Sequence, residues 1–457
     1  MRDNQSGHLP SRTRRQVLRS AAGAATAGGV VGLLGPACAM GGGQVPQKPG
    51  ELSGTIDLTI QNNGPIIAIH EQTIASFKAI APNVTLNYTT VPFSEMATKT
   101  SATAAAGAGA EMQQTYSQFW RGIDASSVFL PLTPLLMSRK EAGDLSVPTL
   151  LDSVWSKKRE VYLIPLQVGV NGAFLQYNAA YFGAAGIDPK KLGTLDDIAQ
   201  AATRLVVRQG QDITRAGLLP TQGTTCIWNW ILDQGGKFYD EKSTKWTWET
   251  LEAERAFQWL LDLYDKHRVA WRTAPSGTTD PMGQGAAAAR LIGPYSISTV
   301  WRNHPDMEGT VLDQPLPAFV PGKQPHYYLD GLNCMTLTAA LDPDDVKAKI
   351  GAAYFRLLFS AENRMRTQAN DYSGAILNYK LYTDPQFKET RFGAIRGPEF
   401  VEKVIKRTVT LNPAASPGPG PQWNKVLNGQ LSIKAALAEL QQVHQTAEDE
   451  ALRSRGA

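Results

Sequence analysis

GTIDLTIQNNGPIIAIHEQTIASFKAIAPNVTLNYTTVP, residues 54–92, is the stretch that decides the fold class. Residues 54–63 alternate apolar and polar side chains and are rich in β-branched types, which predicts a strand that ends in a polar loop. Residues 71–82 place apolar side chains at helical spacing and stop at Pro82, which predicts a helix. Residues 83–92 alternate again. The order strand, helix, strand predicts an α/β fold with helices on the faces of a sheet.

The N-terminal segment has the layout of an export signal. Residues 1–20 carry five arginines and one acid, and residues 21–37 carry no charge. That uncharged run is shorter than the roughly 20 strongly apolar residues of a membrane span. The sequence TRRQVLR around Arg14 and Arg15 resembles the twin-arginine export motif, which implies that the cargo folds before export. The alternative is a basic tail without a targeting role.

The end of this leader fits two kinds of processing. Cys38 follows small residues in LLGPACAM, which resembles a lipobox, although Gly35 stands where such motifs prefer leucine. Residues 37–39, Ala-Cys-Ala, equally fit plain cleavage after a small-x-small site. We therefore expect a leader over residues 1–38, with either a lipid anchor on Cys38 or free secretion. Residues 39–53 then form a flexible tether, because Gly, Pro and Gln do not build a core.

Composition restricts the classes of function. Roughly 415 residues remain after the leader, enough for two or three cores, and no later run reaches 18 apolar residues. The chain has a formal charge of +4, which the leader's five arginines less Asp3 supply alone. The mature chain is thus near neutral, which argues against a nucleic-acid partner. We predict no metal, cofactor or catalytic residues, because no matching motif is present and the histidines are scattered. Cys226 and Cys334 either pair or remain buried thiols.

Later segments continue the α/β pattern. Residues 159–178 read as extended strands. Helices are expected over residues 96–111, 193–207 with Thr194 as N-cap, 250–267, 342–360 with Asp342 as N-cap, and 432–457.

Several segments, taken in order, resemble one family. Together with the leader, the tether and the opening strands, they resemble the extracellular sugar-binding proteins of ABC importers, the group that includes maltose-binding protein. The resemblance spans residues 54–445 and departs from the family pattern at Glu111-Met112, at Tyr295, where a tryptophan is usual, and after Gly374, where a proline is usual. The segments are FLQYNAAYFGAAGID (174–188), GTLDDIAQAATRL (193–205), ILDQGGKFYD (231–240), GQGAAAARLIGPYS (283–296) and AAYFRLLFSAENRMRTQANDYSGA (352–375).

The resemblance implies a two-lobed periplasmic-binding-protein fold of type II, with hinge strands near residues 162–170 and 326–337. Lobe one would comprise residues 54–165 plus 329–375, and lobe two residues 170–325 plus 377–457. A monomer of this kind captures a neutral mono- or oligosaccharide in the cleft between its lobes, closes around it, and delivers it to an ABC permease. It would lie in the cell envelope, periplasmic or on the outer face of the cytoplasmic membrane, and touch the membrane only through a lipid anchor.

Amides and aromatic rings suit a sugar, which offers hydroxyl groups and apolar C–H faces. By resemblance, the ligand-binding residues are Asn62, Asn63, Tyr116, Gln118, Gln167, Asn171, Trp228, Tyr295, Asp330, Gly331, Asn333, Tyr372 and Trp423. Each has a structural alternative. The asparagines can form an Asx turn, the tryptophans can pack inside lobe two, and Asp330 can form a hinge ion pair.

Two other functions remain open. The same fold can bind a non-sugar solute such as a polyamine, a sugar acid or a peptide. A polyamine cleft would show several acids, whereas a sugar-acid cleft would show an arginine. An exported glycosidase or lyase would need two carboxyl groups facing each other about 5–10 Å apart.

Overall fold

The computed structural model describes residues 48–106, 109–120, 127–133, 135–136, 160–168, 172–221, 223–329, 331–371, 375–376, 379–410 and 418–454. The predicted leader and most of the tether lie outside this part, so export and lipidation stay predictions. The predicted residues outside it are Arg14, Arg15, Cys38, Asn171, Asp330 and Tyr372.

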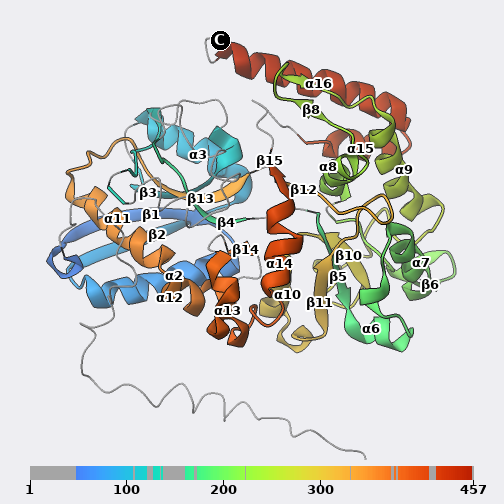
Figure 1. The fold of residues 1–457 in the computed structure, drawn as a ribbon, viewed down its shortest axis with the longest axis horizontal. Helices are drawn as coiled ribbons and strands as arrows, with labels where there is room; N and C mark the ends of the chain where they lie inside the picture. Colours follow the sequence, from blue (N-terminus) through green and yellow to red (C-terminus); the bar gives the residue numbers. More distant parts are fainter. Residues whose placement is uncertain are drawn as a thin grey trace, which may run out of the picture. The chain divides into compact units, whose positions relative to one another are not determined.

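A six-stranded mixed sheet, in the order β14-β4-β13-β3-β1-β2, organises the first part of the fold (Figure 1). β1 pairs in parallel with β2 and β3, whereas β13 pairs antiparallel with β3 and β4. Helices α2 and α11 pack against it. The strands are β1 (Gly54–Gln61), β2 (Val84–Val91), β3 (Met112–Tyr116), β4 (Ile164–Val168), β13 (Leu332–Leu337) and β14 (Ala375–Ile376); the helices are α2 (Gly64–Ile80), α3 (Phe93–Ala106), α11 (Val346–Phe359), α12 (Ala361–Arg366) and α13 (Gln368–Asp371).

The predicted strand–helix–strand opening is present, with one longer element. α2 begins at Gly64, seven residues before the predicted helix, because Asn63 caps it and Pro65 occupies its first turn. Ile56, Leu58 and Ile60 alternate inward on β1. α11 begins later than predicted: its N-cap is Asp345 rather than Asp342, whose side chain accepts a hydrogen bond from the Asp344 backbone in the preceding turn.

A three-stranded antiparallel sheet, in the order β10-β5-β11, organises the second part. α7 has the predicted N-cap, where Thr194 and Asp197 form a reciprocal capping box. The elements are β5 (Phe174–Asn178), β10 (Ala289–Ile292), β11 (Val311–Pro315), α6 (Ala179–Ala184), α7 (Leu195–Leu205), α8 (Gly223–Asp233), α9 (Leu251–Asp265), α10 (Ser296–Asn303), α15 (Gly420–Leu427) and α16 (Ile433–Ser454), with the small hairpins β6 (Val207–Gln209)–β7 (Asp212–Arg215) and β8 (Tyr239–Asp240)–β9 (Lys245–Trp246).

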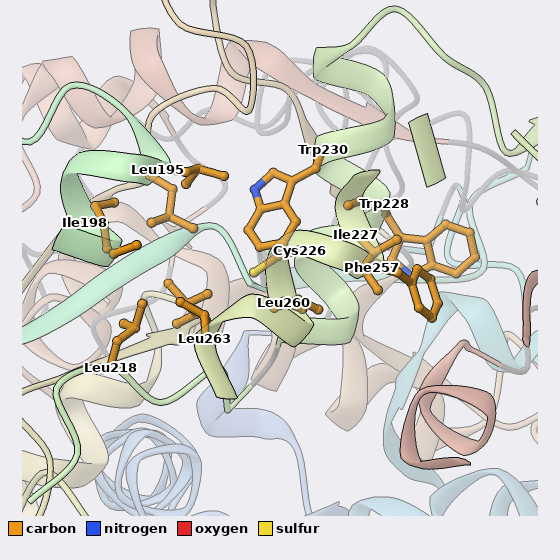
Figure 2. Packing of buried hydrophobic residues seen from close by; sticks show 14 of the residues in the cluster. Leu195, Ile198, Leu218, Cys226, Ile227, Trp228, Trp230, Phe257, Leu260 and Leu263 are labelled. Carbon is orange, nitrogen blue, oxygen red and sulfur yellow. The ribbon is translucent and has the colours of Figure 1, made fainter. Parts of the chain in front are cut away.

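Helix α8 forms the centre of this second core (Figure 2). Trp228 and Trp230 leave it on different sides. The ring of Trp228 packs against Phe238, with centroids 4.3 Å apart, and the ring of Trp230 packs against Trp259 at 4.9 Å. Both indoles are buried, so this part of the fold is tightly packed around aromatic rings.

The same helix holds the chain where it returns toward the first sheet. Asn229 Oδ1 accepts from the Tyr328 backbone N–H at 2.6 Å, and Asp233 accepts from the backbone N–H groups of His326 and Phe319 at 2.6 and 2.9 Å. These contacts fix β12 (Tyr327–Leu329), which also pairs in parallel with β15 (Thr408–Thr410) near α14 (Pro398–Lys403). Two residues separate the end of β12 from the start of β13.

Cys226 and Cys334 are both free and buried. Cys226 Sγ donates to the Gly172 carbonyl at 2.7 Å, and Cys334 lies on β13. Burial raises the pKa of both thiols, so they behave as small apolar groups rather than nucleophiles.

The buried histidines make the fold sensitive to acid. Burial lowers the pKa of His444 to about 4, whereas an unfolded histidine titrates near 6.5. Below about pH 6.5 the unfolded chain therefore binds more protons at this histidine than the folded chain does. The free energy of unfolding consequently decreases as the pH is lowered.

We predict that His444→Gln, which retains an acceptor for the Trp248 indole, reduces this fall by up to about 1.4 kcal/mol per pH unit between about pH 6 and pH 4.5. Urea unfolding at several pH values measures it. His267→Gln, at a partly exposed position, is the control. An identical pH dependence in wild type and His444→Gln would contradict the prediction.

Candidate functional site

Polar side chains meet where three strands of the first sheet lie side by side. In the register of the sheet, Asn333 of β13 stands opposite Tyr116 of β3 on one side and Gln167 of β4 on the other. Residues directly opposite one another point to the same face of a sheet. The structure thus brings together three of the predicted ligand residues that lie far apart in sequence.

Hydrogen bonds join two of these side chains, those of Tyr116 and Asn333, to two further glutamines. Tyr116 Oη donates to Gln61 Oε1 at 2.6 Å, and Gln114 Nε2 donates to Asn333 Oδ1 at 2.8 Å. The backbone N–H of Gln61 donates to Gln114 Oε1 at 2.8 Å. We call Gln61, Gln114, Tyr116, Gln167 and Asn333 the polar centre. Every member is neutral, so this site is suited to hydrogen bonding rather than to charge pairing.

Sequence reasoning missed Gln61 and Gln114. Gln61 ends β1 just before the two predicted asparagines, and Gln114 lies two residues before Tyr116 on one face of β3. The available signal was this two-residue spacing, which places Gln114 and Tyr116 side by side once residues 112–116 are read as a strand.

One amide oxygen within the polar centre and one beside it lack hydrogen-bond partners. The Oε1 atoms of Gln167 and Gln118 are both buried, and Gln167 as a whole is 2% exposed. A Cβ added at Gly331 would lie 1.6 Å from Gln118 Oε1. The predicted ligand residue Gly331 therefore makes room for the Gln118 amide. Buried carbonyl oxygens without donors are costly unless a bound molecule supplies the donor.

Tyr295 reaches the first sheet from the second part of the fold. It follows β10 and directly precedes α10, yet it packs against the apolar core of the first sheet. Burial, with a smaller contribution from Tyr295, raises the pKa of Tyr116. Tyr116 therefore remains a neutral donor, and the two predicted tyrosines lie close together.

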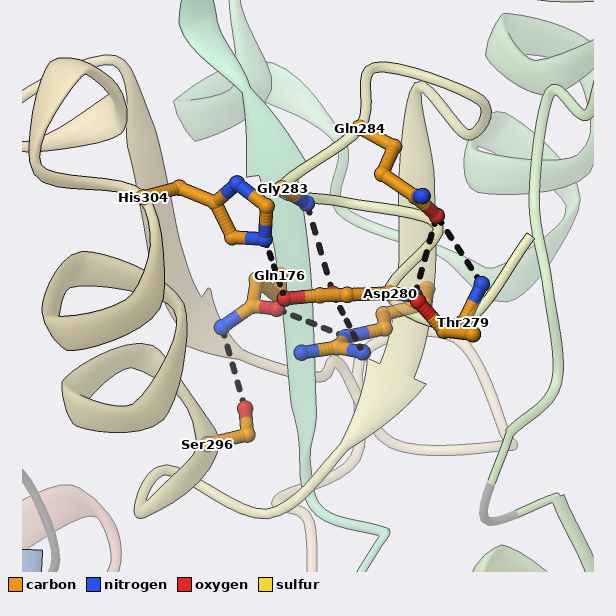
Figure 3. Close-up of polar contacts among 8 residues, drawn as sticks. Gln176, Thr279, Asp280, Gly283, Gln284, Ser296 and His304 are labelled. Atoms are coloured by element: carbon orange, nitrogen blue, oxygen red, sulfur yellow. Dashed lines mark hydrogen bonds and ion pairs between the residues drawn. The ribbon is translucent and has the colours of Figure 1, made fainter. Parts of the chain in front are cut away.

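A buried charged group on the second sheet, Arg290, interacts electrostatically with Tyr295. Figure 3 shows its partners Gln176 and Asp280, with His304 beside Asp280. Arg290 Nε donates to Gln176 Oε1 at 2.7 Å, and its Nη1 lies 3.8 Å from Asp280 Oδ1. Burial lowers the pKa of Arg290, while Asp280 partly offsets this effect. His304 Nε2 lies 3.3 Å from the other Asp280 oxygen. The predicted ligand-binding residues include no arginine; the lone arginine in the apolar run AAAARLIG is the sequence signal for Arg290.

Other predicted residues lie in structural roles. Trp228 and Trp423 are 4% and 6% exposed, and Trp423 packs against Phe257 with centroids 5.8 Å apart. Asn63 caps α2 by accepting from the Ile66 backbone N–H at 3.4 Å, while Asn62 is exposed. These positions favour packing for the tryptophans and capping for Asn63. Within the described ranges, no cluster of three metal-ligating side chains occurs.

Comparison with protein families identifies the chain. Residues 72–392 match the bacterial extracellular solute-binding proteins. The chain belongs to this family. In the part of the chain that the structure describes, no helix has the length and apolar character needed to cross a membrane.

Solved structures with a similar fold align with most of this solute-binding protein and with nearly their whole own length. The GacH receptor of Streptomyces glaucescens GLA.O, solved unliganded and with acarbose, has a TM-score of 0.71 at 21% identity, covering 87% of this chain and 99% of that one. The maltose/maltodextrin-binding domain MalE from Bdellovibrio bacteriovorus, bound to maltotriose, has a TM-score of 0.68 at 16% identity, covering 88% and 100%. These likenesses confirm the predicted two-lobed α/β fold of type II.

Two curated relatives share parts of the sequence. An arabinooligosaccharide-binding protein of Halalkalibacterium halodurans is 30% identical over 176 residues, 37% of this chain. Its Bacillus subtilis counterpart is 26% identical over 251 residues, 52% of this chain. The matched parts span 38% and 54% of the relatives' own lengths.

We predict that Gln114→Leu lowers the free energy of unfolding by about 1–3 kcal/mol, because it leaves the Gln61 N–H and Asn333 Oδ1 without partners. Gln113→Leu is the matched control. Gln113 is similarly buried, points to the opposite face of β3, and donates to the Ala110 carbonyl at 3.2 Å. Urea unfolding of both variants measures the difference; equal losses would show that the polar centre adds nothing specific.

Proposed function

We propose that this solute-binding protein captures a neutral carbohydrate between its lobes and delivers it to an ABC permease. The observation that carries the proposal is a pair of buried amide oxygens without hydrogen-bond partners, one on Gln167 within the polar centre and one on Gln118 beside it. A sugar offers hydroxyl donors to such oxygens. Tyr116 and Tyr295 add aromatic surface for the apolar C–H faces of a sugar ring.

A neutral ligand fits the charges better than a charged one. The polar centre contains only amides and a phenol, whereas a polyamine would need several carboxylates. Two cations lie near Tyr295: Gln176 and Asp280 already engage Arg290, and Asp313 already engages Arg396, which also donates to the Pro294 carbonyl. A sugar acid would have to compete with these carboxylates for a guanidinium group. The names of the curated relatives, which bind arabinooligosaccharides, also support a carbohydrate ligand.

The presence of two separate sheets supports a division into two lobes. We assign residues 54–165 plus 329–375 to lobe one and residues 170–325 plus 377–457 to lobe two, with the ligand binding where Tyr295 approaches Tyr116. Ligand binding would shift an open–closed equilibrium, and the closed form would dock on the permease. The chain would act as an exported monomer in the cell envelope, after twin-arginine export, with or without a lipid on Cys38.

Hydrolysis is the competing function. A glycosidase needs two facing carboxyl groups, whereas the polar centre contains only amides and a phenol. Amides bind sugar hydroxyls but cannot serve as a general acid at neutral pH. This supports binding without chemistry.

We predict that Gln167→Leu weakens carbohydrate binding by about tenfold or more, because the variant lacks the buried acceptor that the ligand would satisfy. Titration calorimetry of the full chain with neutral mono-, di- and trisaccharides identifies the ligand, and the same titration with Gln167→Leu measures the loss. Gln113→Leu, on the opposite face of the sheet, should bind as the wild type does.

Three results would count against the proposal. Binding of a polyamine or a sugar acid, with no neutral sugar bound, would change the ligand class. Disappearance of the sugar during incubation, followed by chromatography, would favour an enzyme. Equal affinity of wild type and Gln167→Leu would remove the polar centre from the binding site.

A further inference from the structure

Phe93 is an exposed aromatic ring at the edge of the polar centre. It is the first residue of α3, directly after β2 and Pro92. The residue is 46% exposed, more than any other Phe, Tyr or Trp in the part of the chain that the structure describes. The next most exposed ring, Tyr88 at 36%, has its hydroxyl bonded to Glu71 Oε1 at 2.6 Å. Phe93 has no polar atom that would favour such exposure.

Two other rings hold Phe93 in place. Its centroid lies 4.9 Å from the centroid of Tyr116 in an edge-to-face contact and 5.5 Å from that of Phe119, and Tyr116 and Phe119 are 5.7 Å apart. Tyr116 is itself fixed by its hydrogen bond to Gln61. Phe93 is therefore a pre-ordered apolar surface, and pre-ordering lowers the entropy cost of binding.

The ring lies beside the polar centre rather than inside it. The Tyr116 hydroxyl bonds to Gln61 and accepts from Asn333 Nδ2 at 3.4 Å, whereas Phe93 packs against the Tyr116 ring. A single sugar bound by the amides would occupy the hydroxyl end of this tyrosine. A ligand that also covers Phe93 must extend beyond that first sugar.

We propose that Phe93, supported by Phe119, stacks against a second sugar of a neutral oligosaccharide whose first sugar binds the polar centre. This inference rests on the proposed function and narrows it: the ligand is an oligosaccharide, and Phe93 determines the preference for length. A flat ring suits the apolar C–H face of a sugar, while its hydroxyl groups remain directed to solvent or to amides.

The test compares ligand length with the Phe93 side chain. Titration calorimetry of the full chain uses arabinose and arabinotriose, and glucose and maltotriose. For whichever sugar series binds, we expect the trisaccharide to bind more tightly than the monosaccharide. Phe93→Ala should weaken trisaccharide binding by about tenfold and leave monosaccharide binding unchanged, while Phe93→Trp should retain trisaccharide affinity.

Two further variants separate stacking from general effects. Phe93→Leu keeps apolar volume but loses the flat ring, so it should resemble Phe93→Ala. Tyr88→Ala removes another exposed ring from β2 of the same sheet and should bind both ligands as the wild type does. Thermal unfolding of each variant shows whether it is folded.

The outcomes distinguish this inference from the function on which it rests. Unchanged trisaccharide affinity in Phe93→Ala, or an equal loss for monosaccharide and trisaccharide, would overturn the role of Phe93 while leaving carbohydrate binding intact. Failure of the wild type to bind any neutral sugar would overturn the proposed function itself.

Discussion

The polar centre depends on the antiparallel insertion of β13 between β3 and β4. This strand comes more than two hundred residues after β3, and its register sets Asn333 opposite both Tyr116 and Gln167. Because side chains alternate along a strand, a shift of one residue would turn Asn333 away from both neighbours and bring an apolar or thiol side chain into its place. Met335 and Leu337 occupy the same face farther along and pack into the apolar core. One strand therefore supplies both the core and the site.

That register needs the chain to reach the first sheet at a fixed position, and α8 of the second part of the fold provides the anchor. Asn229 and Asp233 lie four residues apart, hence on one face of the helix, and both accept backbone N–H groups of the incoming chain. Burial raises the pKa of Asp233, while hydrogen bonds from Phe319 and His326 oppose this effect. The aromatic packing around Trp228 keeps α8 itself rigid, so the buried tryptophans contribute to the site indirectly by holding the helix that anchors β12.

The sequence predicts the elements better than the side-chain roles. The opening strands, the capping box of α7 and the two-lobed fold could be inferred from periodicity, capping residues and an ordered set of family-like segments. The roles of Trp228 and Gln114 could not, because burial and hydrogen-bond partners come from strands and helices distant in sequence. Trp228 satisfies a local pattern for an aromatic cleft wall but meets Phe238 and Trp248 in space. Gln114 has no local feature that distinguishes it from Gln113, and only strand alternation separates their faces.

The second sheet carries a row of buried charged and polar side chains, whereas the polar centre of the first sheet is neutral. This difference bears on the kind of ligand that the protein can bind. Across β10, β5 and β11, Arg290, Gln176 and Asp313 stand in register, and Arg396 closes the row by binding both Asp313 oxygens at 2.5 and 2.6 Å. Buried charges are tolerated when each has a close partner, and here the partners are on the same protein. The polar centre on the first sheet carries no charge. The amide oxygens of Gln167 within it and of Gln118 beside it have no hydrogen-bond donors. The charged row on the second sheet is thus neutralised by partners within the protein, whereas the neutral polar centre on the first sheet keeps an acceptor on Gln167 that a ligand rich in hydroxyl groups would complete.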